Sequence, residues 1–491
     1  MRYALIYFFL LHFCFAQSQV RFNTNLFVGT DTISDIGVKV IELKNGHILS
    51  CGNVLNALVN YNASYLVKTN SLGNVIWKKQ YDVSIGGSYD SFIDLVELPD
   101  SNYLVTGITT NTLTNDDDGF LAKIDTGGNI VWLQKYIHPD DDEITAMRLT
   151  PDGKIIILGY TFSSGTYSDV LLIKTDLNGN LIWRKRFGNT FDEMYRSIEI
   201  IKNNTEYLLG GDYGYYNTGN PYYDMSLMRT DTAGNIIWQQ QYGISPNESG
   251  KCAIPTLDSG FAICGMYNDT GVVLKTNKNG VVQWIKKFSS EPSSIIYSLK
   301  QLQDSTYAMI KSDIDWQNSN RTGNLIKADK NGNQLWKRVY PHPTSGISNY
   351  FFGFNTTADK GFIITGQYNH IGQPFKNMWL VKTDSLGCDS VTCSYLVTGV
   401  KETNLANNGT FSLYPNPNNG SFRIELNDVD NTKDLTTVTI SNLLGQTVLT
   451  KTVNANNSLI KIQDEKLFAG IYIVTLSCEN KIIGQSKIII E

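Results

Sequence analysis

The segment Lys174-Thr175-Asp176-Leu177-Asn178-Gly179-Asn180-Leu181-Ile182-Trp183 decides the fold, because the pattern in its first half returns along the whole chain. The pattern is a basic residue, then Thr, Ile or Ala, then Asp or Asn, two further residues and a Gly. It occurs seven times, at Lys68–Gly73, Lys123–Gly128, Lys174–Gly179, Arg229–Gly234, Lys275–Gly280, Lys327–Gly332 and Lys382–Gly387. A period of 46 to 55 residues indicates a stacked or closed array of repeated units.

Each repeat is predicted to contain four antiparallel strands, which we label a to d. Strands a and b form a hairpin, as in Thr145–Gly159, whose turn at Asp152-Gly153 suits a left-handed backbone. Strand c carries the basic residue and strand d a tryptophan, four residues after the Gly in six of the seven repeats: Trp77, Trp132, Trp183, Trp238, Trp284 and Trp336. Because strand d is apolar on both faces, as in Leu181-Ile182-Trp183, we expect it to be sandwiched between neighbouring repeats.

One strand d is missing from the count, since seven a–b–c sets are accompanied by only six tryptophan strands. An unassigned extended segment, Val20–Val28, precedes the first repeat. If it supplies the absent strand, the first and last repeats share one sheet and the ring closes. The sequence therefore predicts an all-β fold with a seven-bladed β-propeller over residues 17–395, sealed by its N-terminal strand, whereas an open solenoid would leave both ends exposed.

The N-terminus has the composition of an export signal. Met1-Arg2 is followed by the apolar run Ala4–Phe15 and the small residue Ala16, which predicts a signal peptide over residues 1–16. No other apolar stretch approaches the roughly 20 residues of a membrane helix, so no transmembrane segment is expected. The formal net charge is -5, and without a basic surface nucleic acid is not an expected partner.

The C-terminal part forms a second domain. Residues 396–409 are predicted to be a linker, and alternating strands over 410–491 predict a small Ig-like β-sandwich. Tyr414-Pro415-Asn416-Pro417, Gly445-Gln446 and Gly470-Ile471-Tyr472 resemble the type A C-terminal sorting domain of the bacterial type IX secretion system. The resemblance implies a Bacteroidota-type host, delivery by the type IX machinery, and a protein that is secreted or held at the outer cell surface. The final residue, Glu491, departs from the family, which often ends in a basic residue.

The turn Asp125-Thr126-Gly127-Gly128 with Trp132 resembles the tryptophan-docking turns of quinoprotein propellers. The propeller architecture explains this motif without a bound group, and the chain lacks the adjacent Cys-Cys pair that many of those dehydrogenases carry. No cofactor is therefore expected.

Two pairs of cysteines are disulfide candidates, because an exported protein meets oxidising surroundings. Cys388 and Cys393 close a tight loop, while Cys252 and Cys264 lie on either side of a hairpin centred on Asp258. Free buried thiols are the alternative. The sequence contains no paired C-x-x-C spacing, so a zinc site is not expected.

Carboxylates recur at the start of strand a when the repeats are aligned on the Gly that ends strand b. Five of the seven positions are acidic: Asp35, Asp90, Asp142, Glu193 and Glu248. Because the first strand of a propeller blade lines the axis, we expect these groups around one mouth of the central channel, where crowded carboxylates would attract a cation or a donor-rich ligand. No metal is predicted, although the runs Asp116-Asp117-Asp118 and Asp140-Asp141-Asp142 leave calcium open as an alternative. Otherwise each carboxylate accepts hydrogen bonds from loop amides or pairs with a basic side chain.

The connections between strands b and c lie on the same face and are rich in aromatic residues. The longest, Asp212–Asp224, contains Tyr213, Tyr215, Tyr216, Tyr222 and Tyr223, and Trp316 lies in another. Tyrosine suits sugars and protein surfaces because its ring supplies contact area at low entropic cost. The alternative is a self-packed loop that covers the blade edge. The recurring basic residue of strand c, by contrast, is expected to be ion-paired.

These patterns predict an exported, non-catalytic binding or adhesion module with a glycan or protein ligand. The alternative is a surface glycan-degrading enzyme whose carboxylates at the channel mouth act as acid and base. No nucleophile–base motif accompanies them in the sequence.

Overall fold

The computed structural model describes residues 20–490 apart from residues 27–33, 57–60, 84–88, 111–115, 138–140, 163–166, 189–190, 203, 218–219, 244–247, 289–292, 316–319, 341–344, 371–375, 391–395, 399–410, 427–434, 443–446, 455–458, 464–466, 468–469 and 479–480. The predicted signal peptide lies outside these residues. The chain divides into two compact units, Met1–Gly399 and Val400–Glu491. The described part of the chain contains no helix long and apolar enough to cross a membrane.

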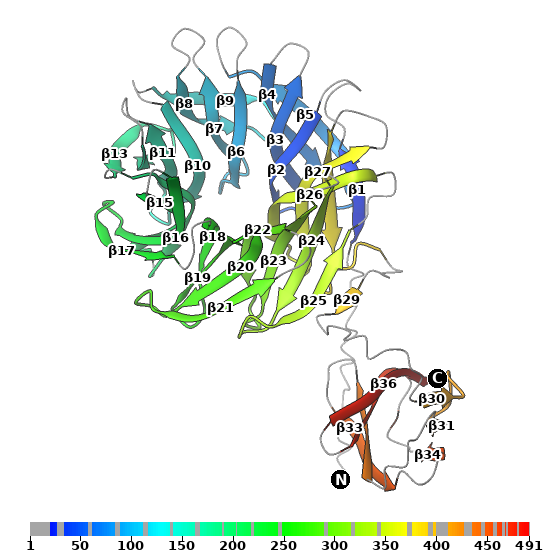
Figure 1. Cartoon of the computed structure of the whole chain (residues 1–491). Helices are drawn as coiled ribbons and strands as arrows, with labels where there is room; N and C mark the ends of the chain where they lie inside the picture. Colours follow the sequence, from blue (N-terminus) through cyan, green and yellow to red (C-terminus); the bar gives the residue numbers. More distant parts are fainter. Residues whose placement is uncertain are drawn as a thin grey trace, which may run out of the picture. The chain divides into compact units, whose positions relative to one another are not determined.

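The first unit is a ring of seven four-stranded blades, each with its first strand innermost (Figure 1). Blades 1 to 3 are β2(Ser34–Glu42), β3(Ile48–Asn56), β4(Tyr61–Thr69) and β5(Val75–Tyr81); β6(Asp90–Glu97), β7(Tyr103–Thr110), β8(Asp117–Ile124) and β9(Ile130–Tyr136); and β10(Asp141–Leu149), β11(Ile155–Phe162), β12(Ser168–Thr175) and β13(Leu181–Phe187). Blades 4 and 5 are β14(Glu193–Ile201), β15(Glu206–Asn217), β16(Asn220–Asp231) and β17(Ile236–Tyr242); and β18(Glu248–Pro255), β19(Phe261–Tyr267), β20(Thr270–Thr276) and β21(Val282–Phe288). Blade 6 is β22(Ser293–Gln301), β23(Tyr307–Asp315), β24(Asn320–Ala328) and β25(Gln334–Val339), and blade 7 contains β26(Ser345–Thr356), β27(Phe362–His370) and β28(Lys376–Thr383).

The N-terminal strand completes blade 7, so the predicted ring closure is confirmed. β1(Phe22–Leu26) pairs antiparallel with β28, in a register that runs from Phe22↔Lys382 to Leu26↔Met378. Phe22 thus lies opposite the basic residue of strand c, as Trp77 lies opposite Lys68 in blade 1. It is the seventh member of the tryptophan series, with Phe in place of Trp.

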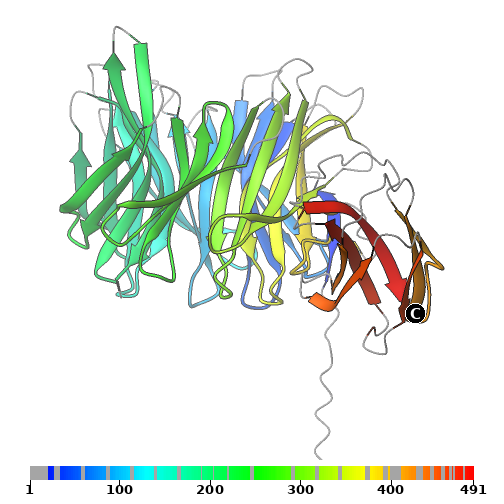
Figure 2. The same ribbon diagram turned by 60° about the horizontal axis from the view of Figure 1, so that its bottom comes forward.

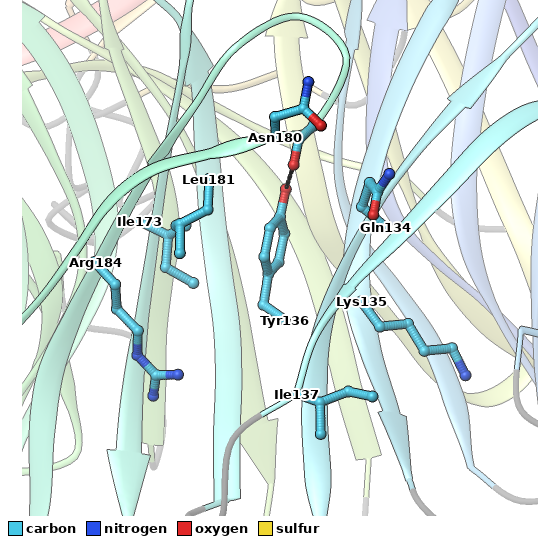
Figure 3. A pocket seen from close by; sticks show the side chains of 9 residues that line it. Gln134, Lys135, Tyr136, Ile137, Ile173, Asn180, Leu181 and Arg184 are labelled. Atoms are coloured by element: carbon cyan, nitrogen blue, oxygen red, sulfur yellow. Dashed lines mark hydrogen bonds between the residues drawn. The ribbon is translucent and has the colours of Figure 1, made fainter.

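The tryptophans hold neighbouring blades together by packing on the glycines of the c–d turns. Gly179 of blade 3 has φ 79°, and a Cβ placed on it would lie 2.9 Å from the ring of Trp132 in blade 2. The hydroxyl of Tyr136 donates to the Gly179 carbonyl over 3.1 Å (Figure 3). A Cβ on Gly73 would likewise meet the Phe22 ring at 3.0 Å, so the closing contact is built as the others are.

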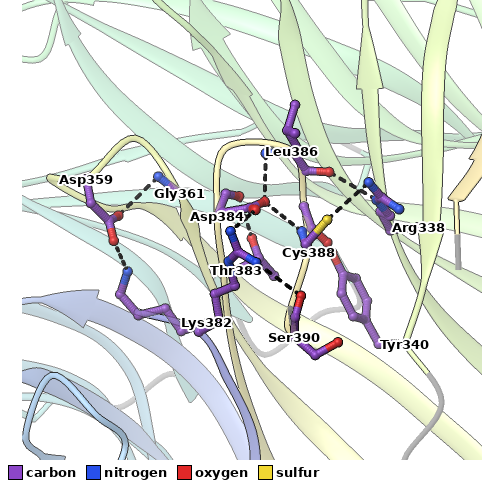
Figure 4. Close-up of polar contacts among 12 residues, drawn as sticks. Arg338, Tyr340, Asp359, Gly361, Lys382, Thr383, Asp384, Leu386, Cys388 and Ser390 are labelled. Atoms are coloured by element: carbon purple, nitrogen blue, oxygen red, sulfur yellow. Dashed lines mark hydrogen bonds and ion pairs between the residues drawn. The ribbon is translucent and has the colours of Figure 1, made fainter. Parts of the chain in front are cut away.

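Within the described structure six of the seven basic residues of strand c form ion pairs, as the sequence predicted, whereas Lys68 donates to the Tyr103 hydroxyl at 2.9 Å and to the Thr126 carbonyl at 3.4 Å. Lys382 pairs with Asp359 of the a–b turn in its own blade at 2.6 Å (Figure 4). Equivalent pairs recur around the ring: Lys123–Asp100 at 2.7 Å, Lys275–Asp258 at 2.9 Å and Lys327–Asp304 at 3.2 Å. These cations therefore do not form a free positive ring.

Strand d is not sandwiched between blades, which corrects the prediction. Leu181 and Ile182, at the start of β13, are 56% and 45% exposed. Strand d is the outermost strand of its blade, and the blades diverge with distance from the axis. Trp183, Arg184 and Lys185, which follow in β13, are partly buried.

The end of the first unit is attached to blade 6. β29(Leu396–Thr398), within the segment predicted to be linker, pairs antiparallel with the outer strand β25. Cys388 is disulfide-bonded, while its expected partner Cys393 lies outside the described residues. The Arg338 guanidinium donates to the Leu386 carbonyl at 3.0 Å and lies 3.3 Å from the Cys388 sulfur (Figure 4).

The second unit contains two small sheets that enclose one apolar core. One sheet is β30(Phe411–Tyr414), β31(Ser421–Leu426) and β34(Leu459–Gln463), and the other is β33(Thr447–Asn454), β32(Leu435–Asn442), β35(Gly470–Cys478) and β36(Lys481–Ile490). Ile424, Val438 and Val474 are fully buried between them. In the Tyr-Pro-Asn-Pro motif, the Asn416 amide donates to the Lys487 carbonyl and accepts from the Ile489 N–H, both at 2.8 Å, so the motif clamps the last strand.

Candidate functional site

The five aligned carboxylates lie in the interior of the ring rather than around an open mouth. Their residues are 0–3% exposed. Asp90 accepts the Val83 N–H at 2.7 Å, and Asp142 pairs with Arg184 of the outer strand β13 at 2.9 Å. The expectation of crowded, open carboxylates at the channel mouth is therefore corrected for Asp35, Asp90, Asp142, Glu193 and Glu248.

Glu193 has a pKa well above that of an ordinary carboxyl group. Burial raises its pKa to about 7, with nearby Asp169 acting in the same direction and a hydrogen bond from Gln239 opposing both. The folded protein thus holds the Glu193 proton more tightly than the unfolded chain does.

The pH dependence of stability should report this proton. Because the Glu193 pKa is raised in the folded state, its stabilising contribution is fully present below about pH 4.5 and is lost as the pH rises through about 7. Glu193→Gln should therefore raise the thermal midpoint relative to wild type near pH 8 and change it little near pH 5. Thermal unfolding at both pH values tests this, with exposed Asp269→Asn as the control. Parallel pH curves for Glu193→Gln and wild type would contradict it.

The tyrosine-rich segment 212–224 belongs to a β-hairpin in which β15 and β16 pair up to Asn217 and Asn220. In Figure 2 this green hairpin rises above the neighbouring blades. The rings of Tyr215 and Tyr222 stack across it with centroids 5.7 Å apart and planes at 24°. Both side chains are partly exposed.

Two further tyrosines of this set anchor the base of the hairpin. The Tyr223 hydroxyl donates to Asp192 at 3.3 Å. Tyr213 packs against Phe191 with ring centroids 6.1 Å apart. The side chain of Tyr216 and all of Trp316 lie outside the described residues.

A cluster of charged side chains on the axis was not predicted from the sequence. Asp94 of blade 2 pairs with Lys39 of blade 1 at 2.9 Å and with Arg148 of blade 3 at 3.1 Å, and Arg148 also pairs with Glu199 of blade 4 at 2.7 Å. Lys300 of blade 6 lies within electrostatic range of Lys39, Arg148 and Glu199. Side chains from blades 1, 3, 4 and 6 can meet only near the axis of a seven-bladed ring. We call these five residues the axial cluster.

The axial cluster escaped prediction because strand a carries a β-bulge in every blade, as between Gly37 and Lys39 or between Phe92 and Asp94. The bulge adds one residue to the strand and so reverses the alternation of side-chain direction. Residues after the bulge therefore point to the side opposite to the one that simple alternation predicts. A search for charged residues just after the bulge would have found Lys39 and Asp94.

A shallow hollow of about 330 Å³ lies between blades 2 and 3 on the outer side of the ring (Figure 3). Its polar lining groups are already engaged, since Tyr136 donates to Gly179 and Arg184 pairs with Asp142. We regard it as a seam between blades.

Cys252 and Cys264 face each other across the β18–β19 hairpin, in the register the sequence predicted, but both thiols are free. The Cys264 thiol donates to the Ile296 carbonyl at 3.7 Å and the Cys252 thiol to the Leu299 carbonyl at 3.9 Å. Cys51 is also a free, buried thiol. Among the described residues no group of three or more His, Cys, Asp or Glu side chains is arranged to hold a metal ion.

Comparison with protein families identifies the second unit. Residues 412–491 match the family described as "Secretion system C-terminal sorting domain". This match confirms the resemblance found in the sequence, and it implies the type IX secretion machinery as a partner. The protein is therefore secreted to the cell surface or the exterior. No curated protein matches the chain significantly.

Solved structures similar to the chain include β-propeller proteins of low sequence identity. Puromycin hydrolase has a TM-score of 0.46 and 10% identity over 80% of this chain and 59% of its own. The β-propeller domain of the Trilobed protease from Pyrococcus furiosus has a TM-score of 0.41 and 9% identity over 71% and 95%. Acylaminoacyl peptidase of Pyrococcus horikoshii has a TM-score of 0.41 and 10% identity over 82% and 59%. The chain thus spans about three fifths of the length of the two full-length enzymes, and likeness at this level carries no argument about activity.

Proposed function

We propose that this exported propeller is a non-catalytic binding or adhesion module that holds a glycan or protein ligand at the β15–β16 hairpin. The observation that carries the proposal is the partly exposed, stacked pair Tyr215 and Tyr222 on a ladder that extends beyond the other blades. A hairpin orders these rings before a ligand arrives, so little entropy is lost on binding. Aromatic faces of this kind suit the apolar face of a sugar ring or a protein surface.

Delivery of this module is proposed to follow the order of the segments along the chain. The signal peptide over 1–16 starts export, the propeller of residues 17–395 is the working part, and the sorting domain of 410–491 addresses it to the type IX machinery. Mass spectrometry of the secreted form should find cleavage near residue 409. Retention of the last 80 or so residues would count against this order.

Loss of the two stacked tyrosine side chains should strongly weaken ligand binding without unfolding the propeller. The double variant Tyr215→Ala, Tyr222→Ala is expected to lose at least about tenfold in affinity for ligands selected on glycan and protein arrays, because such rings carry much of the energy of an interface. Tyr89→Ala is the matched control, since Tyr89 is 44% exposed just before β6. Unchanged binding by the folded double variant would refute the proposal.

The alternative of a glycan-degrading enzyme is favoured by one observation, the raised pKa of Glu193. A carboxyl that is still protonated near neutral pH has the property of a general acid. Glu193 is only 2% exposed, however, so a substrate would have to open the site. Reducing-sugar release that disappears in Glu193→Gln or Asp142→Asn would replace the binding proposal by the enzymatic one.

A further inference from the structure

We propose that the axial cluster binds a carboxylate group, as a free organic acid or as the acid group of a sugar. The cluster contains three cationic side chains, those of Lys39, Arg148 and Lys300, and two carboxylates, Asp94 and Glu199. It therefore carries one positive charge in excess. A single carboxylate group balances that charge.

Asp94 is fully used by the protein and is not available to repel a bound anion. It forms ion pairs with Lys39 and Arg148 and accepts a hydrogen bond from the Met147 N–H at 3.0 Å. Burial opposes its ionisation, but the two cations and this hydrogen bond outweigh burial and lower its pKa. The Leu95 N–H also donates to it, at 2.9 Å, so its negative charge is spread over four donors.

Lys300 is the group that lacks a counter-charge of its own. Among the described residues it forms no ion pair within 4.0 Å, whereas Lys39 and Arg148 both do. Burial lowers its pKa, and so do Lys39 and Arg148, while Glu199 acts in the opposite direction. A bound carboxylate near its ammonium group would relieve this repulsion.

Solvent reaches the cluster. The side chains of Lys39, Arg148 and Glu199 are 28%, 25% and 22% exposed. A part-buried site of this kind strengthens attraction to an anion relative to bulk water and screens it less. The site is distinct from the tyrosine hairpin, so the two proposals stand or fall separately.

Cys252 of blade 5 is a competing source of negative charge, because it lies within electrostatic range of Lys300 and Glu199. The hydrogen bond from Cys264 lowers the Cys252 pKa, burial acts against this, and Lys300 lowers it further. A thiolate at Cys252 would neutralise part of the positive charge that attracts the ligand. Cys252→Ser, which cannot ionise, should therefore bind the carboxylate at least as tightly as wild type.

The experiment compares glucuronate with glucose by calorimetric titration of the propeller-containing chain at low salt near pH 7. Glucuronate and acetate are expected to bind and glucose to give no heat. Tighter binding of glucuronate would identify a sugar acid as the ligand source, and equal affinity would identify a free organic acid. Tighter binding of inorganic phosphate than of either carboxylate would overturn the assignment.

Two variants with opposite expected effects on carboxylate affinity distinguish a specific loss of binding from misfolding. Lys300→Gln should weaken carboxylate binding about tenfold, whereas Glu199→Gln, which adds to the charge excess, should tighten it several-fold. Lys330→Gln removes one positive charge at an exposed turn and should leave the affinity unchanged. Equal affinities for wild type, Lys300→Gln and Glu199→Gln would overturn the proposal.

Discussion

Replacing both Phe22 and Leu26 by alanine is expected to open the ring and to lower the free energy of unfolding by about 3–6 kcal/mol. Leu26 is 3% exposed and lies opposite Met378, and the Phe22 ring packs on Gly73 of blade 1. Their loss leaves two cavities at the one place where the two ends of the propeller meet. Urea unfolding followed by tryptophan fluorescence measures the change.

The polar contacts of β1 and of the preceding residue Arg21 should not keep the ring closed once the two apolar side chains are removed. Asn23 accepts the indole N–H of Trp379 at 2.6 Å, and Arg21 pairs with Asp384 at 2.8 Å. Once the apolar contacts are lost, these groups can be solvated and β28 becomes an exposed sheet edge.

Two controls separate ring opening from simple loss of packing. Phe22→Trp restores the residue found in the other six blades and should keep the stability of wild type. Trp132→Ala removes a tryptophan within the ring and should destabilise it without making the N-terminal segment more sensitive to protease. A double variant that unfolds and resists protease as wild type does would show that β1 is not the closure.

Among glycine-to-alanine substitutions in the propeller, Gly265→Ala is expected to destabilise the protein most, lowering the free energy of unfolding by about 3 kcal/mol or more. A Cβ on Gly265 would lie 1.8 Å from the Ser249 carbonyl oxygen, which is a backbone atom that cannot rotate away. The β-bulge between Gly250 and Cys252 pushes strand a toward this position. The same contact recurs at Gly52 and Gly107, where an added Cβ would lie 1.9 Å from a carbonyl oxygen of strand a.

The matched control is Gly46→Ala in the a–b turn of blade 1. Gly46 has φ 77°, but a Cβ there meets no atom within 4 Å. Its cost is the backbone strain alone, about 1 kcal/mol. Similar midpoints for the two variants in thermal unfolding would show that the strand b glycines are not selected by this contact.

Local pattern predicted the number of blades and their closure because each blade repeats the same short-range chemistry. The turn glycine and the tryptophan four residues later both report contacts between successive blades, so counting them counts blades. Phe22 cannot be recognised from the repeat pattern because it differs from the repeated tryptophan. Only its register opposite Lys382 reveals its role.

The candidate sites were predicted less well, because the partners of each side chain come from distant strands. Asp142 and Glu193 are recognisable in the sequence as aligned carboxylates, but whether they are open to solvent or enclosed depends on the side chains that other strands bring to them. Asp142 is matched by Arg184, 42 residues away on the outer strand. No alignment of repeats shows such a partner.

The amino-acid sequence by itself determined the architecture and the address of this protein. Repeat period, turn residues and the sorting motifs are all encoded within short segments, and each segment folds in the same way wherever it recurs. Tertiary structure alone decided which charges meet. Lys39, Arg148 and Lys300 come from three separate blades and are unrelated in any local pattern, and only closure of the ring brings them to a common axis.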